Sequence, residues 1–128
     1  VTIKPDLPKS LPYKGNELLL GSALNHLLEN AIHFSPKKGE VLLHLESHET
    51  EIVLSVQDQG EGIPEFAAER AFERFFSYRP DDETKGNGLG LAFVKEIANL
   101  HLGRVNIFTP EQGGTCAFIA LPLIPENR

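Results

Sequence analysis

The chain has only one cysteine, fewer basic than acidic residues and no long apolar run. Each of these shortages argues against a class of structure or function. With Cys116 alone, no internal disulfide can form, which fits a reducing compartment. No apolar stretch approaches the roughly 20 residues that span a bilayer, and no signal peptide is evident. Twelve basic residues against eighteen acidic ones argue against non-specific nucleic-acid binding, which requires a basic surface.

The length of 128 residues suits one compact domain, and we expect residues 1–128 to form a single unit without internal repeats. The chain opens with Val1-Thr2-Ile3, a strand-like pattern without an initiator methionine. We therefore expect it to be part of a longer protein.

Apolar spacing predicts both strands and helices. A short first strand leads into a connector with three prolines, which exclude helix up to residue 15. A helix is expected to follow Asn16, a residue type that suits an N-cap, and to end at about Phe34. The other predicted elements are strands over 40–46, 51–57, 104–108 and 115–121, a short helix or turn over 66–76, a polar loop over 77–87, and a helix running to about residue 102. We expect the four phenylalanines of residues 66–76 to lie in the core.

Three glycines at every second position precede the last helix, in Gly86-Asn87-Gly88-Leu89-Gly90-Leu91. Glycine permits positive φ and close approach of a ligand to the backbone. The free N–H groups of the following helix turn, with the positive end of the helix dipole, suit an anion such as phosphate. The spacing alone fits a plain flexible loop equally well.

Two further polar positions invite a functional interpretation. Asp58 follows a strand and precedes Gly60 and Gly62, so its carboxylate can face a pocket, although Asp-x-Gly is also a common turn sequence. Asn30 shares the polar face of the first helix with two histidines, and such a face is often simply solvated.

These motifs occur in one fixed order, and together they resemble the catalytic ATP-binding domain of bacterial sensor histidine kinases. That domain belongs to the wider group of Bergerat-fold ATPases, which includes gyrase B, Hsp90 and MutL. The resemblance covers roughly residues 16–122. Within the sensor kinases, Phe72-Glu73-Arg74-Phe75-Phe76 and the run of residues 88–94 look most like the CreC type. The resemblance implies an α+β fold, a two-layer α/β sandwich with helices on one face of a mixed, mainly antiparallel sheet.

The resemblance also implies a site for ATP and Mg²⁺ between the helix of residues 16–34 and a lid over residues 77–87. Asn30 matches the Mg²⁺ ligand, and a neutral amide oxygen suits such a site. Asp58 matches the carboxylate that accepts a hydrogen bond from the adenine amino group, and Thr115 matches a hydroxyl near the adenine. The other residues expected to bind ATP are His26, His33, Gly60, Gly62, Ile63, Phe75, Lys85, Gly86, Gly88, Leu89, Gly90 and Leu91.

Three departures from the family pattern concern histidines. His26 stands where many relatives carry a second asparagine, and His33 where they often carry lysine or arginine. A neutral imidazole binds phosphate more weakly than lysine does, so we expect modest ATP affinity that falls above about pH 7. His101-Leu102-Gly103 replaces the usual His-Gly-Gly, and we interpret His101 as structural.

The leading functional hypothesis is phosphoryl transfer from ATP to a histidine on an upstream dimerisation domain. A response regulator would be a further partner, and the parent protein would be an inner-membrane sensor with this domain in the cytoplasm. His48-Glu49-Thr50 is similar to an acceptor motif, but it lacks the following proline and falls in a predicted hairpin turn.

Three alternatives remain open. An ATP hydrolase of the gyrase or Hsp90 type, or an anti-sigma-factor serine kinase, would usually have glutamate where this chain has His26. A nucleotide-binding module without catalysis is the third alternative. In every case, we expect the lid to be poorly ordered without ligand, since it has few apolar side chains.

Overall fold

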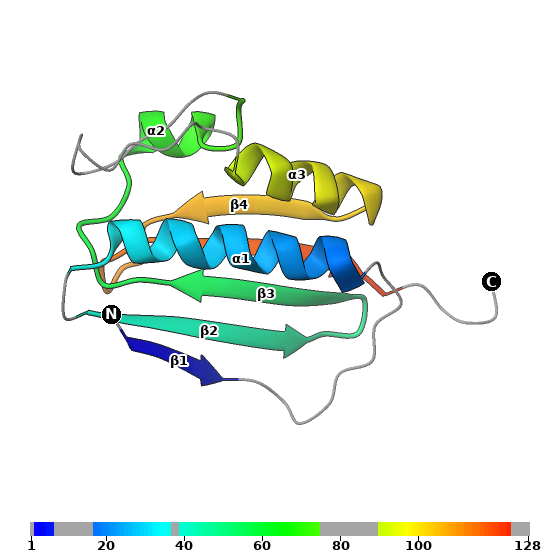
Figure 1. Cartoon of the computed structure of the whole chain (residues 1–128), viewed down its shortest axis with the longest axis horizontal. Helices are drawn as coiled ribbons and strands as arrows, with labels where there is room; N and C mark the ends of the chain where they lie inside the picture. The colour runs from blue at the N-terminus through cyan, green and yellow to red at the C-terminus, as the bar shows by residue number, and fades with distance from the viewer. Residues whose placement is uncertain (1, 7–16, 37–38, 75–89, 124–128) are drawn as a thin grey trace.

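The computed structural model describes residues 2–6, 17–36, 39–74 and 90–123, and Figure 1 shows them as helices and strands. Its strands are β1 (Thr2–Asp6), β2 (Glu40–Ser47), β3 (Glu51–Gln57), β4 (Arg104–Phe108) and β5 (Cys116–Pro122), and its helices are α1 (Glu17–Phe34), α2 (Glu65–Arg70) and α3 (Gly90–Leu100). The strands form one sheet, and α1 and α3 cover one of its faces (Figure 1). This is the predicted two-layer α/β sandwich.

The sheet has the strand order β1-β2-β3-β5-β4. β1 pairs with β2 in parallel, and α1 is the crossover that parallel neighbours require. The remaining neighbours are antiparallel, with Leu43 opposite Val56 and Leu54 opposite Ile119. The prediction of a mixed, mainly antiparallel sheet is therefore confirmed.

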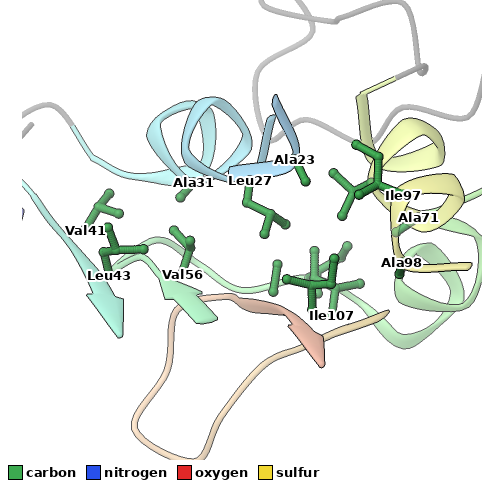
Figure 2. Packing of buried hydrophobic residues seen from close by; sticks show 14 of the residues in the cluster. Ala23, Leu27, Ala31, Val41, Leu43, Val56, Ala71, Ile97, Ala98 and Ile107 are labelled. Carbon is green, nitrogen blue, oxygen red and sulfur yellow. The ribbon is translucent and has the colours of Figure 1, made fainter. Parts of the chain in front are cut away.

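One hydrophobic core holds the two layers together (Figure 2). Leu27 of α1 and Val94 of α3 are fully buried, and Ile97 lies beside them. On the sheet side of the same core, Val41 and Ile107 are buried. Because α1 and α3 pack on the same core, the polar residues they carry are fixed relative to the sheet. No helix in the part of the chain that the structure describes is long and apolar enough to cross a membrane.

The predicted strands and the first long helix agree with the structure to within a residue or so, but the aromatic segment does not. Only α2 is helical there, and Phe66 is 63% exposed. The expectation that all four phenylalanines lie in the core is therefore wrong for Phe66. The buried face of α2 is formed by Ala67, with Ala71 just beyond the helix, so Phe66 is left on the other side. Phe72 packs against the core. Phe75 and Phe76 lie outside the described residues, as do Asn16 and the expected lid.

Helix α3 ends at Leu100, earlier than the predicted limit near Leu102. Leu102 takes a φ of 61°, and the N–H of Gly103 donates to the carbonyl of Ala98 at 2.7 Å. This left-handed turn is the usual way to end a helix, but the position normally carries glycine because a side chain strains it.

We therefore expect Leu102→Gly to raise the free energy of unfolding by about 0.5–1 kcal/mol, which thermal or urea denaturation would measure. The Leu102 side chain is 76% exposed, so little packing is lost. The matched control is Leu100→Gly, at a comparably exposed leucine that is the last residue of α3, where the low helix propensity of glycine should lower stability by up to about 1 kcal/mol. Equal losses in both variants would contradict the strain at Leu102.

Candidate functional site

Asp58 lies immediately after the last residue of β3 and is almost fully buried, with 2% exposure. Its Oδ1 accepts two backbone hydrogen bonds, from Gly60 N–H at 2.8 Å and from Thr115 N–H at 3.1 Å. The Asp58 N–H donates in turn to the Thr115 carbonyl at 2.9 Å. Asp58 and Thr115 thus continue the β3–β5 ladder by one residue, and this pairing fixes the orientation of the carboxylate.

The other carboxylate oxygen, Asp58 Oδ2, is buried and has no hydrogen-bond partner, and the same holds for Thr115 Oγ1. Among the described residues, these are the two buried side-chain polar atoms left unsatisfied. An unsatisfied buried polar atom costs about 1–3 kcal/mol. Two such atoms on paired neighbours therefore point to a ligand with at least one donor group.

Burial raises the pKa of the Asp58 carboxyl, against the opposing effect of the hydrogen bonds from Gly60 and Thr115. Burial also raises the pKa of the Cys116 thiol, and the nearby Asp58 charge adds to that rise. Cys116 is thus a small buried residue at the start of β5. The Asp58 carboxyl is partly desolvated, and its Oδ2 can still accept a hydrogen bond. Such a group suits a neutral N–H donor, for example an amino group on an aromatic ring.

Two glycines bring the loop after β3 close to the turn between β4 and β5. Gly114 has a φ of 77°, and a Cβ there would lie 2.0 Å from the Asp58 carbonyl oxygen. Gly62 has a φ of 93°, and a Cβ there would lie 2.6 Å from Thr109 Oγ1. A side chain is excluded at Gly114 by the Asp58 backbone, and at Gly62 by the Thr109 side chain together with the positive φ. Ile63, the next residue, is buried.

The second part of the site lies on α1, where Asn30 is buried with 7% exposure. The interpretation of this helix face as simply solvated is therefore wrong at Asn30. His26, one turn earlier, is half-buried and packs edge-on against Phe93 with 5.4 Å between ring centroids. A Cβ on Gly90 would lie 3.2 Å from His26 Nδ1, so His26 rests against the first residue of α3. His33 is exposed at the end of the helix.

Figure 1 shows that the C-terminal end of α1 and the end of β3 lie at the same end of the molecule. Helix α3 starts beside the middle of α1, where His26 rests against Gly90 (Figure 1). The structure thus brings together Asp58, Thr115 and Gly60 by direct hydrogen bonds, and Gly62 of the same loop lies against Thr109. Leu91 packs against the core. Lys85, Gly86, Gly88 and Leu89, like Phe75, lie outside the described residues.

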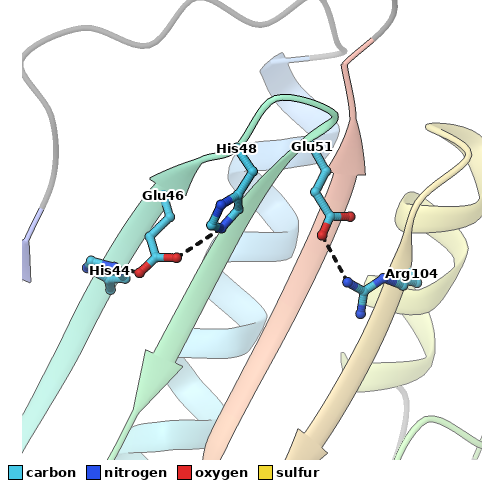
Figure 3. A network of polar contacts seen from close by, with 5 residues as sticks. All are labelled: His44, Glu46, His48, Glu51 and Arg104. Carbon is cyan, nitrogen blue, oxygen red and sulfur yellow. Dashed lines mark hydrogen bonds and ion pairs between the residues drawn. The ribbon is translucent and has the colours of Figure 1, made fainter.

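His48 lies at the opposite end of the β2–β3 hairpin from Asp58. β3 has seven residues between that turn and Asp58, which corresponds to about 20 Å of extended chain. Figure 3 shows His48 beside Glu46, with His48 Nε2 3.0 Å from Glu46 Oε2, and it also shows the Glu51–Arg104 ion pair. The adjacent carboxylate would repel an incoming phosphate, so the geometry gives no support to His48 as an acceptor.

His101 fits its interpretation as a structural residue. Its Nδ1 lies 2.8 Å from the carbonyl of Ile97, which identifies a hydrogen bond to the last turn of α3. The side chain therefore helps to end the helix at the left-handed Leu102.

The described residues contain no group of three or more His, Cys, Asp or Glu side chains that could hold a metal ion. Mg²⁺ does not need such a cage, because it is commonly held by one or two protein oxygens together with substrate phosphates and waters. A single buried amide such as Asn30 fits this kind of site.

The sequence gives no signal for Thr109, whose hydroxyl contacts the backbone of Ile63. Thr109 follows the last residue of β4 and looks like an ordinary turn residue in the sequence. Its partner is 46 residues away, so no local pattern could have identified the contact.

The chain matches the family described as histidine kinase-, DNA gyrase B- and HSP90-like ATPase over residues 15–125. It is 40% identical to sensor protein CreC of Escherichia coli (strain K12) over 114 residues, which are 89% of this chain and 24% of CreC. Mycobacterial sensor histidine kinase MprB is 34% identical in its solved structure, with a TM-score of 0.78 over 88% of this chain and 77% of that one. Histidine kinase ThkA, solved in complex with response regulator protein TrrA, is 25% identical with a TM-score of 0.77, over 99% of this chain and 35% of that one.

The chain thus spans about a quarter of the length of CreC. The family match covers almost all of the described residues, and the solved relatives share the two-layer fold. The resemblance to sensor kinases, including the CreC type, is confirmed by these matches. This chain belongs to the histidine kinase-, DNA gyrase B- and HSP90-like ATPase family.

Proposed function

We propose that this chain is the ATP-binding catalytic domain of a sensor histidine kinase. In this proposal it positions Mg·ATP for transfer of the γ-phosphoryl group to a histidine on a dimerisation domain elsewhere in the parent protein. The observation that carries the proposal is the buried pair of unsatisfied atoms, Asp58 Oδ2 and Thr115 Oγ1. Support also comes from the ATPase family and from relatives named as sensor kinases.

The Asp58 and Thr115 pair is suited to adenine. The adenine amino group is a neutral donor, and Asp58 Oδ2 is an acceptor with an open position. A guanine would present a carbonyl oxygen at the same place, and two acceptors would then face each other. Thr115 Oγ1 can donate or accept, so it can hydrogen-bond a ring nitrogen directly or through water.

The residues on α1 and α3 are suited to the phosphates. Asn30 would supply an oxygen to Mg²⁺, which would neutralise phosphate charge when it is bound. Gly90 begins α3, and the first N–H groups of a helix, with the positive end of its dipole, attract an anion. His26 packs against Gly90 and Phe93 of α3 and would contact the phosphates from the helix side.

Phosphoryl transfer relies mainly on positioning and charge neutralisation, so the site needs no general base of its own. Hydrolysis by a gyrase-type or Hsp90-type mechanism, or serine phosphorylation by an anti-sigma-factor kinase, would normally use a carboxylate at position 26. His26 instead packs on Phe93 and Gly90. This packing favours transfer to a histidine over those two alternatives.

The proposed partners lie outside this chain. The first is the dimerisation domain that carries the acceptor histidine, in a homodimeric parent protein. The second is a response regulator, since the related kinase ThkA was solved in complex with one. We further propose that the parent is an inner-membrane sensor and that this domain lies in the cytoplasm.

The test is to incubate the full-length parent protein with ATP labelled at the γ-phosphate. We expect an acid-labile, base-stable label on a histidine outside this chain, at a rate well above that of free phosphate release. Label on His48 in the isolated 128-residue chain would contradict the division of labour. Rapid phosphate release without a labelled protein would favour the hydrolase, and absence of turnover with intact ATP binding would favour a module without catalysis.

A further inference from the structure

We propose that Thr109 is a positioning residue for the adenine pocket. Its hydroxyl would fix the loop of residues 58–63, which carries the main chain that approaches the base. This role rests on the proposed function, because it assumes that the pocket beside Asp58 binds adenine.

The contact between Thr109 and Ile63 has two points. The Ile63 N–H donates to Thr109 Oγ1 at 2.8 Å, and the same hydroxyl donates to the Ile63 carbonyl at 3.1 Å. One side chain thereby satisfies both backbone polar groups of a residue 46 positions away. Two hydrogen bonds to one residue fix its orientation as well as its distance, which one bond would leave free.

Thr109 also packs on the preceding residue of the loop. A Cβ on Gly62 would lie 2.6 Å from Thr109 Oγ1 and 2.8 Å from Thr109 Cγ2. The threonine side chain therefore occupies the space that the glycine leaves open, and its methyl group contributes to this contact. Gly62 has a φ of 93°, so this is also the point where the loop changes direction.

The loop is held at both of its ends by the same hairpin. At the first end, Asp58 pairs with Thr115, immediately before β5. At the second end, Ile63 is bound by Thr109, directly after β4. Between them, Gln59 and Glu61 are exposed. The β4–β5 hairpin therefore holds the loop at two points, an arrangement that we call the clamp. Thr109 forms the second of these points through its side chain.

The clamp has a consequence for affinity. Without it, the segment from Gly60 to Ile63 would sample more conformations in the free protein, and ATP would have to order it on binding. Thr109 is itself exposed, so water can replace its hydrogen bonds and the fold should tolerate their loss. We expect weaker ATP binding with little change in stability.

The test compares Thr109→Val with Thr109→Ser in the full-length parent protein. Valine keeps the shape and removes the hydroxyl, and serine keeps the hydroxyl. We expect the KM for ATP to rise about tenfold in Thr109→Val, with kcat at saturating ATP within about twofold of the wild type. Thr109→Ser should restore the KM to within about threefold. Thr50→Val, at the exposed turn of the other hairpin, is the matched control and should change neither parameter.

Hydrogen exchange at the Ile63 amide provides an independent readout, which we expect to be at least tenfold faster in Thr109→Val than in the wild type. An unchanged KM in Thr109→Val, or a serine variant as weak as the valine variant, would overturn the positioning role alone. A parent protein that binds no ATP would overturn the proposed function, and the positioning role with it. Exchange at Ile63 would then still report whether the clamp itself exists.

Discussion

Asp58→Asn should weaken ATP binding on the order of 100-fold and reduce the preference for ATP over GTP. The asparagine carbonyl can keep the two hydrogen bonds that Asp58 Oδ1 accepts, from Gly60 and Thr115. Its amide group then takes the place of Oδ2 and faces the adenine amino group with a second donor. A buried, mismatched donor pair costs several kcal/mol. Guanine carries an acceptor at that position, so GTP should lose much less affinity. Titration calorimetry with both nucleotides measures the two values.

The same substitution should leave the nucleotide-free protein at least as stable as the wild type at pH 7. The pKa of Asp58 is raised in the folded state because the carboxyl is buried. A raised pKa means that the folded state favours the protonated acid. The wild type is therefore relatively most stable below the ordinary pKa of aspartate, and this advantage is lost as pH rises through the folded-state pKa. Asparagine does not ionise, so the free energy of unfolding of Asp58→Asn should lack this decrease with rising pH. Urea denaturation at several pH values measures it.

Glu61→Gln is the matched control, because Glu61 is an exposed carboxylate in the same loop. We expect it to change ATP affinity by less than threefold. An Asp58→Asn protein that keeps the ATP affinity of the wild type, or loses ATP and GTP equally, would remove the assignment of Asp58 to the base.

Asn30→Ala should abolish the Mg²⁺-dependent part of ATP binding and lower phosphoryl transfer by about 100-fold or more in the full-length parent. A metal ion on the phosphates stabilises the transition state by several kcal/mol, and Asn30 is the amide expected to hold it. Nucleotide affinity would be measured with Mg²⁺ and with a chelator. The wild type should show a large difference between the two conditions, and the variant should show almost none.

Asn25→Ala provides the control for this second experiment. Asn25 lies on the same helix, five positions earlier, and is exposed, whereas Asn30 is buried. If both alanine variants lose activity to the same extent, the effect comes from the helix and not from a metal ligand. Thermal unfolding of both variants would show whether the helix itself is disturbed.

The elements with a strong, regular pattern could be predicted from the sequence. The apolar face of α1 and the alternation in β2 and β3 depend on local spacing, and the structure agrees with them closely. The end of α3 and the exposed side of α2 could not be predicted. Leu102 adopts a left-handed turn that its residue type disfavours, and Phe66 is exposed although aromatic residues are usually buried.

The same holds for the site, where residues in local motifs could be predicted and contacts between distant segments could not. The resemblance predicts binding roles for Asp58, Thr115 and Asn30, because each lies in a recognisable motif. It could not show that Asp58 and Thr115 pair across the sheet and leave one oxygen each without a partner. That arrangement, like the contact of Thr109 with Ile63, depends on segments about 50 residues apart. Sequence patterns of short range carry no information about it.

The strand order has a consequence for how the protein is made. β5 is the last strand in the sequence, yet it lies between β3 and β4 in the sheet. Until β5 has left the ribosome, β4 has no place in the sheet and Asp58 lacks its partner Thr115. Contacts of such long range form slowly, and a nascent chain exposes the unpaired edge of β3 in the meantime. The nascent domain is therefore most open to aggregation before β5 has been synthesised, and a chain truncated ahead of Thr115 would lack the backbone partner of Asp58.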